Sequence, residues 1–467
     1  MKISFNNNTK EAKKDTLFVS VGSKNEDQVE KENGVKTLYL KCDEPEKMNL
    51  RKLFLLARKM VMLAKNAKAE RISFDFNDFK FKQINVSEIE LAEIIGTEFD
   101  LANYEFTEYK SKKENTLIKE IYISGTNKET EKAFLKGQMI ALEVNKTRTL
   151  SNIPGGDMTP QILARSAKEA VKNLPVKVTV LGEKEMEKLK MQAILSVGRG
   201  SDEESKFIIL EYFGGPKEKK PIVLVGKGVT FDSGGINLKP SSSLLGMNMD
   251  MSGGAAVIHA LALVAKMKLK KNVIGLIPSV ENFISGKSYR PGDVIRSMSG
   301  QTIEILNTDA EGRVILADAL TYARKYNPEV VIDIATLTGA SCVALGERMS
   351  AIFTDDDKLC VELEKIGDRT GDYVWRLPMW EEYENEIKGS LGDFTNIHNK
   401  DSRYGGATYG AVFHHQFIKN KDGDKKTSKW AHIDMAPRMT AMAGEFLAVG
   451  AIGTPVKLLY QFIEEYK

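Results

Sequence analysis

The stretch PIVLVGKGVTFDSGG (221–235) decides the fold class through its first five residues. They form an uncharged apolar run, which is followed by a glycine-rich segment with charged residues. The run PIVLV is typical of a strand that is buried on both faces of a sheet. Similar short runs stand at 206–212 (KFIILEY), 272–278 (NVIGLIP) and 330–335 (VVIDIA). The same alternation of strand and helix patterns continues around them, so we predict an α/β domain with a central mixed sheet flanked by helices.

The first 150 residues repeat this alternation on a smaller scale. Strand patterns occupy 16–21, 35–41, 71–76 and 118–124. An amphipathic helix is indicated by the apolar spacing of Leu50, Leu53, Phe54, Ala57, Val61 and Ala64. A helical stretch at 130–149 ends in the Pro- and Gly-rich segment NIPGGDMTP (152–160), where Thr159 and Pro160 suit the start of a new helix. We therefore predict an N-terminal α/β domain at 1–150 and a larger catalytic domain at 151–467.

Composition excludes several classes of protein. Of the 467 residues, 42% are hydrophobic and 28% are charged, which is typical of a soluble globular chain without a membrane span. The 67 basic and 64 acidic residues give no electrostatic argument for nucleic acid binding. Three cysteines without a CxxC pair argue against a disulfide framework. The N-terminal stretch MKISFNNNTKEAKKD (1–15) lacks the apolar core of a secretion signal, so we expect a cytoplasmic location.

Two segments place ligand-type residues beside predicted strands and helices. Lys227 and Asp232 lie in a glycine-rich turn just past the strand at 221–225, where open α/β sheets hold their sites. A flexible loop with surface charges is the plain alternative, and the phosphate-binding pattern GxxxxGK[ST] is not matched. Asp250 precedes a helix at 253–266, where N-capping is an equally good interpretation. His259, inside that helix, is expected to be a packed residue.

The segment NTDAEGR (307–313) is the sharpest signal. In extended backbone, residues two apart point the same way, so Asp309 and Glu311 can present two carboxylates to one point, with Arg313 next in line. Two like charges held together need a counter-charge, or one carboxylate must be protonated. A divalent cation satisfies this condition, whereas the alternative is a polar turn between a strand and a helix.

The available ligands limit the choice of metal. There are only five histidines and no HExxH pattern, and adjacent His414 and His415 point apart in any regular structure, so we expect no site rich in histidine or cysteine. Asp232, Asp250, Asp309 and Glu311 suffice for a pair of metal ions. Carboxylates favour Mg or Mn, while a neutral lysine amine among the ligands favours Zn, Mn or Co.

These segments together resemble the leucyl aminopeptidase (cytosol aminopeptidase) family. The match comprises NTDAEGR (307–313), VGKGVTFDSGGINLKP (225–240), MDMSGGAA (249–256), YRPGDVI (289–295), DIATLTGA (333–340) and WAHIDMA (430–436). It covers residues 150–467 and is weak before them. The resemblance implies a cytoplasmic homohexamer that releases leucine-like residues from peptides with a free N-terminus, through attack of a water molecule activated by two metal ions.

The resemblance also implies individual roles. Lys227, Asp232, Asp250 and Glu311 would hold one ion, and Asp232, Asp309 and Glu311 the other, with Asp232 and Glu311 bridging. Lys239 and Arg313 would be catalytic, the lysine facing the oxyanion and the arginine holding a bicarbonate ion. The substrate pocket would be lined by Met247, Thr336, Leu337, Gly339, Ala436 and Met439. Pro437 stands where the family pattern has glycine, and Pro455 precedes the last helix in an uncommon place.

Two other functions compete with this hypothesis. The same carboxylates could serve a metal-dependent hydrolase acting on another substrate, such as a phosphoester, which would not need a free amine. A DNA-binding or structural protein could keep the fold, although the even distribution of charge argues against nucleic acid.

Overall fold

A computed structural model describes residues 1–5, 16–42, 44–112, 117–402, 404–419 and 428–467 of the chain. Most of the N-terminal stretch used above to exclude a secretion signal, residues 6–15, lies outside the described residues. The chain divides into two compact units. Unit 1 comprises Met1–Asn145 and Thr440–Gly450, and unit 2 comprises Lys146–Met439 and Ala451–Lys467. The division falls within helix α3 (Lys128–Asn152), and a short segment from near the C-terminus belongs to unit 1.

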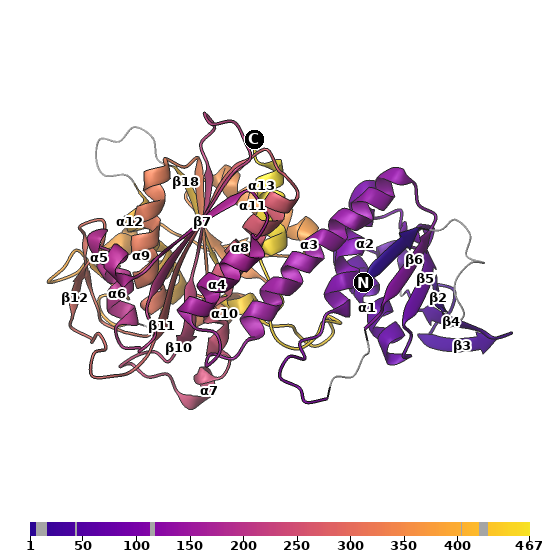
Figure 1. The fold of residues 1–467 in the computed structure, drawn as a ribbon, viewed down its shortest axis with the longest axis horizontal. Coiled ribbons are helices and arrows are strands. Elements are labelled where there is room, and N and C mark those ends of the chain that lie inside the picture. The colour runs from indigo at the N-terminus through magenta and orange to yellow at the C-terminus, as the bar shows by residue number, and fades with distance from the viewer. Residues whose placement is uncertain (6–15, 43, 113–116, 403, 420–427) are drawn as a thin grey trace. The chain divides into compact units, whose positions relative to one another are not determined.

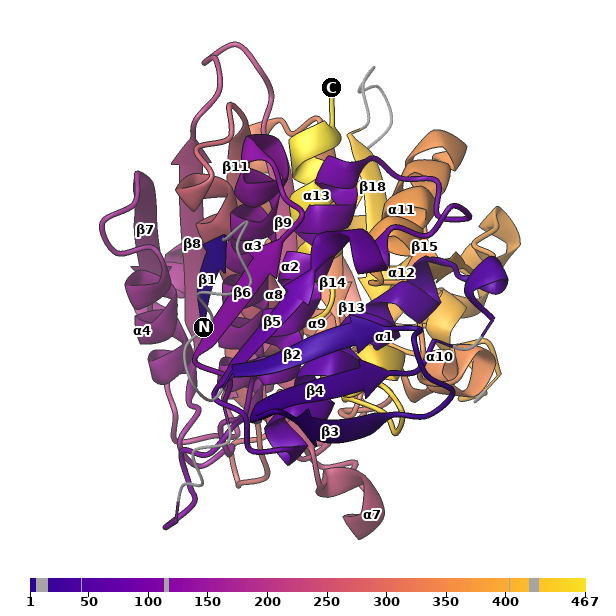
Figure 2. The same ribbon diagram turned by 90° about the vertical axis from the view of Figure 1, so that its right-hand side faces the viewer.

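Unit 1 is built on a six-stranded sheet (Figures 1 and 2). The strand order is β1-β6-β5-β2-β4-β3, and all neighbours are parallel except β3 and β4. The strands are β1 (Lys2–Phe5), β2 (Thr16–Val21), β3 (Gln28–Glu32), β4 (Val35–Leu40), β5 (Arg71–Asp75) and β6 (Glu120–Ser124). Helices α1 (Leu50–Asn66) and α2 (Glu88–Asn103) complete the core, in which Phe74 makes edge-to-face contacts with Phe79 and Phe99.

Unit 2 contains a nine-stranded mixed sheet, as predicted. Its order is β16-β15-β18-β14-β9-β11-β8-β7, with β10 also paired to β11. The central neighbours β18, β14, β9 and β11 are parallel, whereas β15, β8 and β7 add antiparallel pairs. The strands are β7 (Val176–Leu181), β8 (Lys206–Phe213), β9 (Ile222–Gly226), β10 (Gly228–Asp232), β11 (Asn272–Asn282), β14 (Val330–Ala335), β15 (Ser350–Phe353), β16 (Val374–Arg376) and β18 (Lys429–Asp434). A small separate sheet holds β12 (Val294–Arg296), β13 (Thr302–Glu304) and β17 (Phe394–Thr395).

Helices cover both faces of the large sheet (Figure 1). One face carries α4 (Pro160–Ala170), α8 (Ser252–Lys266), α11 (Asp357–Thr370) and α13 (Val456–Glu465). The other carries α5 (Glu183–Lys188), α6 (Gln192–Gly198), α9 (Glu311–Ala323) and α12 (Gly406–Ile418). The short helices α7 (Ser241–Leu244) and α10 (Gly339–Leu345) lie in the connections. As expected, α4 begins at Pro160 and is capped by Thr159, whose side chain accepts a hydrogen bond from the backbone N–H of Ile162.

One described stretch, Met247–Lys266, has the length and apolar composition of a membrane-crossing helix, but 83% of its most apolar 18-residue window is buried inside the protein. It comprises the 3-10 helix η4 (Met247–Met251) and α8, which packs on β9, β11 and β14. His259 is buried in α8, as expected of a packed residue. The stretch is therefore a core helix of unit 2.

Three parallel strands, β18, β14 and β9, end side by side at one edge of the large sheet, whereas β11 continues to Asn282. The residues that follow the three ends are Lys227 after β9, Thr336 after β14 and Met435 after β18. The prediction of a glycine-rich turn after 225 was wrong in part. Residues 228–232 form the strand β10 beside β11, because their N–H and C=O groups find partners along that strand's extension. Lys227 consequently lies at a break between two strands.

Candidate active site

Lys227 is fixed by its backbone and surrounded by carboxylates. Its N–H donates to the carbonyl of Ile334 at 2.9 Å, and its own carbonyl accepts from the N–H of Gly254 at 2.7 Å. The buried Nζ lies 2.7 Å from Oδ2 of Asp250 and 2.8 Å from Oε1 of Glu311. It also donates to the carbonyl of Thr336 at 3.0 Å. Three segments far apart in the sequence thus meet at one amine.

Asp250 faces this amine and does not cap helix α8. It lies inside η4, and the residue before the helix is Met251, which makes no side-chain cap. Oδ1 of Asp250 accepts a hydrogen bond from Oγ1 of Thr336 at 2.6 Å. The capping interpretation is therefore wrong, since the carboxylate of Asp250 contacts Lys227 and Thr336 and the N-cap position of α8 is held by Met251.

Asp309 and Glu311 converge, but not through extended backbone as predicted. Glu311 is the first residue of α9, and Ala310 before it has φ −113° and ψ 42°. The turn into the helix brings oxygens of Asp309 and Glu311 within 4.8 Å of one another and of an oxygen of Asp232. A side chain at Gly312 would lie 2.7 Å from Nζ of Lys227, so the glycine allows the lysine to cross the start of α9.

Lys239 bridges the other two carboxylates of the cluster. Its Nζ lies 2.8 Å from Oδ2 of Asp232 and 2.6 Å from Oδ1 of Asp309. Asp232 is buried at the end of β10, whereas 34% of the Asp309 side chain is exposed. The site therefore opens to solvent on the side of Asp309 and Lys239.

The charges of the protein shift several pKa values in this cluster. Burial and the charge of Asp232 raise the pKa of Glu311 to about 8. Burial raises the pKa of Asp250 to about 6, although Lys227 opposes the shift. Burial would lower the pKa of Lys227, but the negative charges of Asp250, Glu311 and Asp232 outweigh it and raise the pKa. Burial raises the pKa values of the two carboxyl groups, and the excess of carboxylates over lysines accounts for the raised pKa of Lys227.

The donor set suits hard divalent cations. Four carboxylates face two lysines, which leaves two negative charges in excess if all are ionised. Oδ2 of Asp250 and Oε1 of Glu311 are buried and, although close to Lys227, have no hydrogen bond of suitable geometry among the described residues. Buried carboxylate oxygens without hydrogen-bond donors are positions where a metal ion can complete the coordination.

Arg313 lies two residues into α9 and is buried. Its Nε has no hydrogen-bond partner in the part of the chain that the structure describes. Burial lowers the pKa of its guanidinium to about 10, and the charges of Glu311 and Asp434 oppose the shift. A buried guanidinium of this kind can bind a small oxyanion.

The residues expected to line a pocket occupy two loops and η4. Thr336, Leu337 and Gly339 lie between β14 and α10 or at the start of α10. Ala436 begins the 3-10 helix η7 (Ala436–Arg438), and Met439 follows it. Met247 begins η4, three residues before Asp250. Of these, Thr336 contacts the carboxylate cluster through the hydrogen bonds given above. Pro437 is buried in η7, and Pro455 directly precedes α13.

Sequence reasoning missed Asn282, the last residue of β11. Its buried amide donates to Oδ1 of Asp232 at 2.8 Å and to the carbonyl of Thr308 at 3.1 Å. Its carbonyl accepts hydrogen bonds from Ser233, next to Asp232. Asn282 therefore orients Asp232 and ties it to the NTDAEGR segment. The sequence feature that could have indicated this role is a polar residue, Asn282, at the end of an apolar strand.

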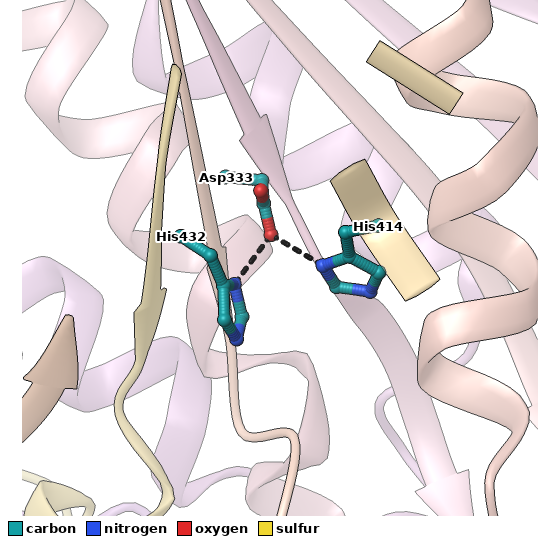
Figure 3. A group of neighbouring side chains, drawn as sticks. All are labelled: Asp333, His414 and His432. Atoms are coloured by element: carbon teal, nitrogen blue, oxygen red, sulfur yellow. Dashed lines mark hydrogen bonds and ion pairs between the residues drawn. The ribbon is translucent and has the colours of Figure 1, made fainter. Parts of the chain in front are cut away.

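A second cluster, also missed, lies beneath α12. Asp333, His414 and His432 come from β14, α12 and β18 and are fully buried (Figure 3). Oδ1 of Asp333 lies 2.6 Å from Nδ1 of His432 and 2.9 Å from Nδ1 of His414, and Oδ2 accepts from Trp430 Nε1 at 2.7 Å. Ligands of one tetrahedral ion would lie roughly 3.3 Å apart, given metal–ligand bonds of about 2.0–2.1 Å. The spacing is that of hydrogen bonds, although the His414 contact is poorly aligned.

Comparison with known proteins agrees with this geometry. Residues 145–460 match the family model described as the cytosol aminopeptidase family, catalytic domain. A probable cytosol aminopeptidase of Nitrosomonas eutropha is 47% identical over 366 residues, covering 77% of this chain and 71% of the relative. A protein of the same description from Rickettsia peacockii is 44% identical over 381 residues, covering 80% of this chain and 75% of the relative.

The chain belongs to the cytosol aminopeptidase family. It is accordingly a metal-dependent aminopeptidase, a hydrolase of peptides, and the DNA-binding or structural alternative finds no support. A solved structure of the bottromycin maturation enzyme BotP has a TM-score of 0.85 and 28% identity, covering 96% of this chain and 98% of that one. The same enzyme in complex with Mn gives the same TM-score over 97% of this chain and 99% of that one.

Proposed function

We propose that the carboxylate cluster holds two divalent metal ions and that this dinuclear centre releases N-terminal residues from peptides. The observation that carries the proposal is the convergence of four carboxylates on two lysines at the edge of the large sheet. One ion is assigned to Lys227, Asp232, Asp250 and Glu311, and the other to Asp232, Asp309 and Glu311. Asp232 and Glu311 would serve as ligands of both ions.

The ions, when bound, lower the pKa of a water molecule that serves as nucleophile and polarise the scissile carbonyl. Lys227 must then be a neutral amine, because an ammonium group has no lone pair to donate. The carboxylates that raise its pKa would be neutralised by the cations, and burial would then favour the neutral form. Zn or Mn is the proposed metal, with Co or Mg as alternatives. The complex of BotP with Mn supports Mn.

Lys239 and Arg313 are proposed as the catalytic residues that do not hold metal. The carboxylates around Lys239 raise its pKa above the usual value despite burial, which keeps it an ammonium. A fixed positive charge at this place stabilises the oxyanion that develops during attack on the carbonyl. Arg313 is proposed to hold a bicarbonate ion that relays the proton, because its guanidinium is buried and Nε has no hydrogen-bond partner among the described residues.

Specificity is assigned to the first residue of the peptide. A free α-amine is required, and the first side chain would rest against Met247, Thr336, Leu337, Gly339, Ala436 and Met439. A largely apolar lining favours leucine-like residues. The preference is expected to be shallow, because one methylene is worth only about 1–3 kcal/mol.

Assembly and location are proposed from the family as a whole. A cytoplasmic homohexamer is the expected form, with residues 151–467 as the catalytic domain and residues 1–150 serving assembly or regulation. The names of the relatives, cytosol aminopeptidases, support the location.

The function is tested by comparing hydrolysis of Leu-p-nitroanilide with hydrolysis of its N-acetylated form. Rapid release of p-nitroaniline from the free amine, and none from the acetylated compound, is the expected result. Equal rates would exclude an aminopeptidase and would favour a hydrolase of another substrate on the same carboxylates.

A further inference from the structure

Asp434, the last residue of β18, is fully buried and accepts an unusual number of hydrogen bonds. Its Oδ1 accepts from the backbone N–H of Leu337 at 3.0 Å, of Thr338 at 3.4 Å and of Ala436 at 3.2 Å. Its Oδ2 accepts from Oγ1 of Thr338 and Oγ of Ser341, both at 2.6 Å. No cation lies within ion-pair distance of this carboxylate in the described part of the chain, so these five bonds offset its burial.

The donors belong to both walls of the assigned substrate pocket. Leu337 and Thr338 lie in the loop between β14 and α10, and Ala436 begins η7. Thr338 also caps α10, accepting a hydrogen bond from the N–H of Ser341 at 3.2 Å. One carboxylate therefore connects the start of α10, the preceding loop and the segment after β18.

The loop between β14 and α10 is held at its other end by the metal-ligand cluster. Oγ1 of Thr336 binds Asp250, and its carbonyl accepts from Lys227. Leu337 follows Thr336 directly, and its own N–H donates to Asp434. Its side chain packs against α12 at Gly410, where a Cβ atom would lie 2.9 Å from Cδ2 of the leucine. The position of Leu337 relative to the cluster thus depends on Asp250 and Lys227 on one side and on Asp434 on the other.

We propose that Asp434 is a positioning residue for the aminopeptidase reaction, which fixes the two pocket walls relative to each other and so determines how the first side chain of the peptide is held. The inference rests on the pocket assignment made under the proposed function. Without the carboxylate, the backbone N–H groups of Leu337, Thr338 and Ala436 and the hydroxyls of Thr338 and Ser341 lose their acceptor. The resulting shift of the wall weakens binding, and a misplacement of about 1 Å at a site can cost about a hundredfold in rate.

The test compares Asp434→Ala and Asp434→Asn with Asp318→Ala. Asp318 is a matched control, because it is fully buried and accepts three backbone hydrogen bonds from Ala193, Ile194 and Met298. Each purified full-length variant is assayed for kcat and KM on leucine and alanine p-nitroanilides, for bound metal and for melting temperature.

Asp434→Ala is expected to lower kcat/KM for the leucine substrate by about tenfold or more, chiefly through KM, with unchanged metal content. The ratio of kcat/KM for leucine over alanine should fall with it. Asp434→Asn should lose less, because the amide keeps one acceptor oxygen for the N–H groups and its NH2 can donate to the two hydroxyls. Asp318→Ala should lower the melting temperature without changing the ratio.

Three results would overturn the proposal. One is an unchanged ratio in Asp434→Ala, and another is a change in Asp318→Ala as large as that in Asp434→Ala. The third is loss of metal from Asp434→Ala, which would mean that the residue supports the metal site and not the pocket.

If Asp434→Ala does not fold, Thr338→Val and Ser341→Ala can replace it, because each removes one hydrogen-bond donor to Asp434. An unchanged leucine-to-alanine ratio in both variants would also overturn the proposal. Leu337→Ala distinguishes a failure of the Asp434 proposal from a failure of the pocket assignment. An unchanged leucine-to-alanine ratio in that variant contradicts the pocket assignment itself.

Discussion

Lys227 and Lys239 are both lysines beside carboxylates, yet their surroundings differ. Lys227 is buried and contacts Asp250 and Glu311, whereas Lys239 is partly exposed and contacts Asp232 and Asp309. A buried amine among ligands can coordinate a metal once it loses its proton, while a more exposed ammonium remains charged. The same residue type is thus assigned two different roles.

Exchange of each lysine for alanine distinguishes the two roles. Lys227→Ala is expected to reduce occupancy of one of the two metal positions, because a ligand is lost. Lys239→Ala should keep both ions and lower kcat by about a hundredfold or more, as removal of an oxyanion-stabilising group does. Metal content by mass spectrometry, together with steady-state kinetics, checks both. A Lys239→Ala protein without metal would show that the roles are wrongly assigned.

Asn282 is not an assigned metal ligand, but it contacts one, Asp232, and its role can be tested separately. Asn282→Ala removes the amide that orients Asp232 and holds the carbonyl of Thr308. Loss of such a partner typically costs about 10–100-fold in metal affinity or activity. Titration of the metal-depleted variant with Mn should show this weakening. Asn237→Ala is a useful comparison, because Asn237 binds Thr308 but not Asp232, and it should weaken metal binding less.

At the scale of elements, the site depends on close packing of α8 against two strands. A Cβ atom at Gly253, at the start of α8, would lie 2.3 Å from the carbonyl oxygen of Ile334 and 3.2 Å from the backbone nitrogen of Lys227. These are backbone atoms, which cannot move aside independently. The glycine therefore lets the helix start approach β9 and β14 closely enough for Asp250 to reach Lys227.

Gly253→Ala is accordingly expected to destabilise unit 2 by about 1–3 kcal/mol through overpacking and to lower metal occupancy. Thermal unfolding with and without added Mn measures both effects. Gly286→Ala is the control, since a Cβ atom there would meet nothing within 4 Å. Equal melting temperatures for the two variants would contradict the packing argument.

The interface between the large sheet and α12 depends on Asp333. Burial would raise the pKa of this carboxyl, but His432 and His414 hold it well below its usual value. A lowered pKa stabilises the folded state above the unfolded pKa of about 4, and this stabilisation is lost as the pH falls below that value. The acid stability of the protein is therefore linked to one buried carboxylate.

Asp333→Asn should reduce stability at pH 7 by about 1–3 kcal/mol, because the amide cannot accept all the ring N–H groups. Between pH 5 and 3 the variant should lose stability less steeply than the wild-type protein, since the titrating carboxyl is gone. Urea unfolding at a series of pH values measures the difference. A slope for Asp333→Asn steeper than that of the wild-type protein would contradict the assignment.

At the scale of the whole molecule, the chain divides into a small α/β unit and a large one that carries every assigned ligand. The almost equal numbers of basic and acidic residues leave no electrostatic basis for nucleic acid binding. We expect the protein to assemble as a homohexamer. Light scattering should then give a mass about six times that of the 52.0-kDa chain, and the mass of a single chain would contradict the expectation.

Much of the fold could be predicted because hydrophobic pattern is a local property. The apolar runs at 206–212, 221–225, 272–278 and 330–335 became β8, β9, β11 and β14 with small changes at their ends. The candidate ligands were found for a similar reason, since carboxylates at the ends of buried strands are conspicuous in sequence. By itself the sequence determined the fold class and the family, and it predicted which types of residue would serve as metal ligands.

The tertiary structure decided which groups meet. Lys227 lies at a break between two strands, and Glu311 reaches the cluster from the first turn of α9, neither of which the local pattern indicated. Asn282, Asp333 and Asp434 acquire their roles from partners up to about a hundred residues away. The physical reason is that such contacts arise from strand pairing and helix packing across the whole unit, whereas sequence periodicity reports only which face of an element is apolar.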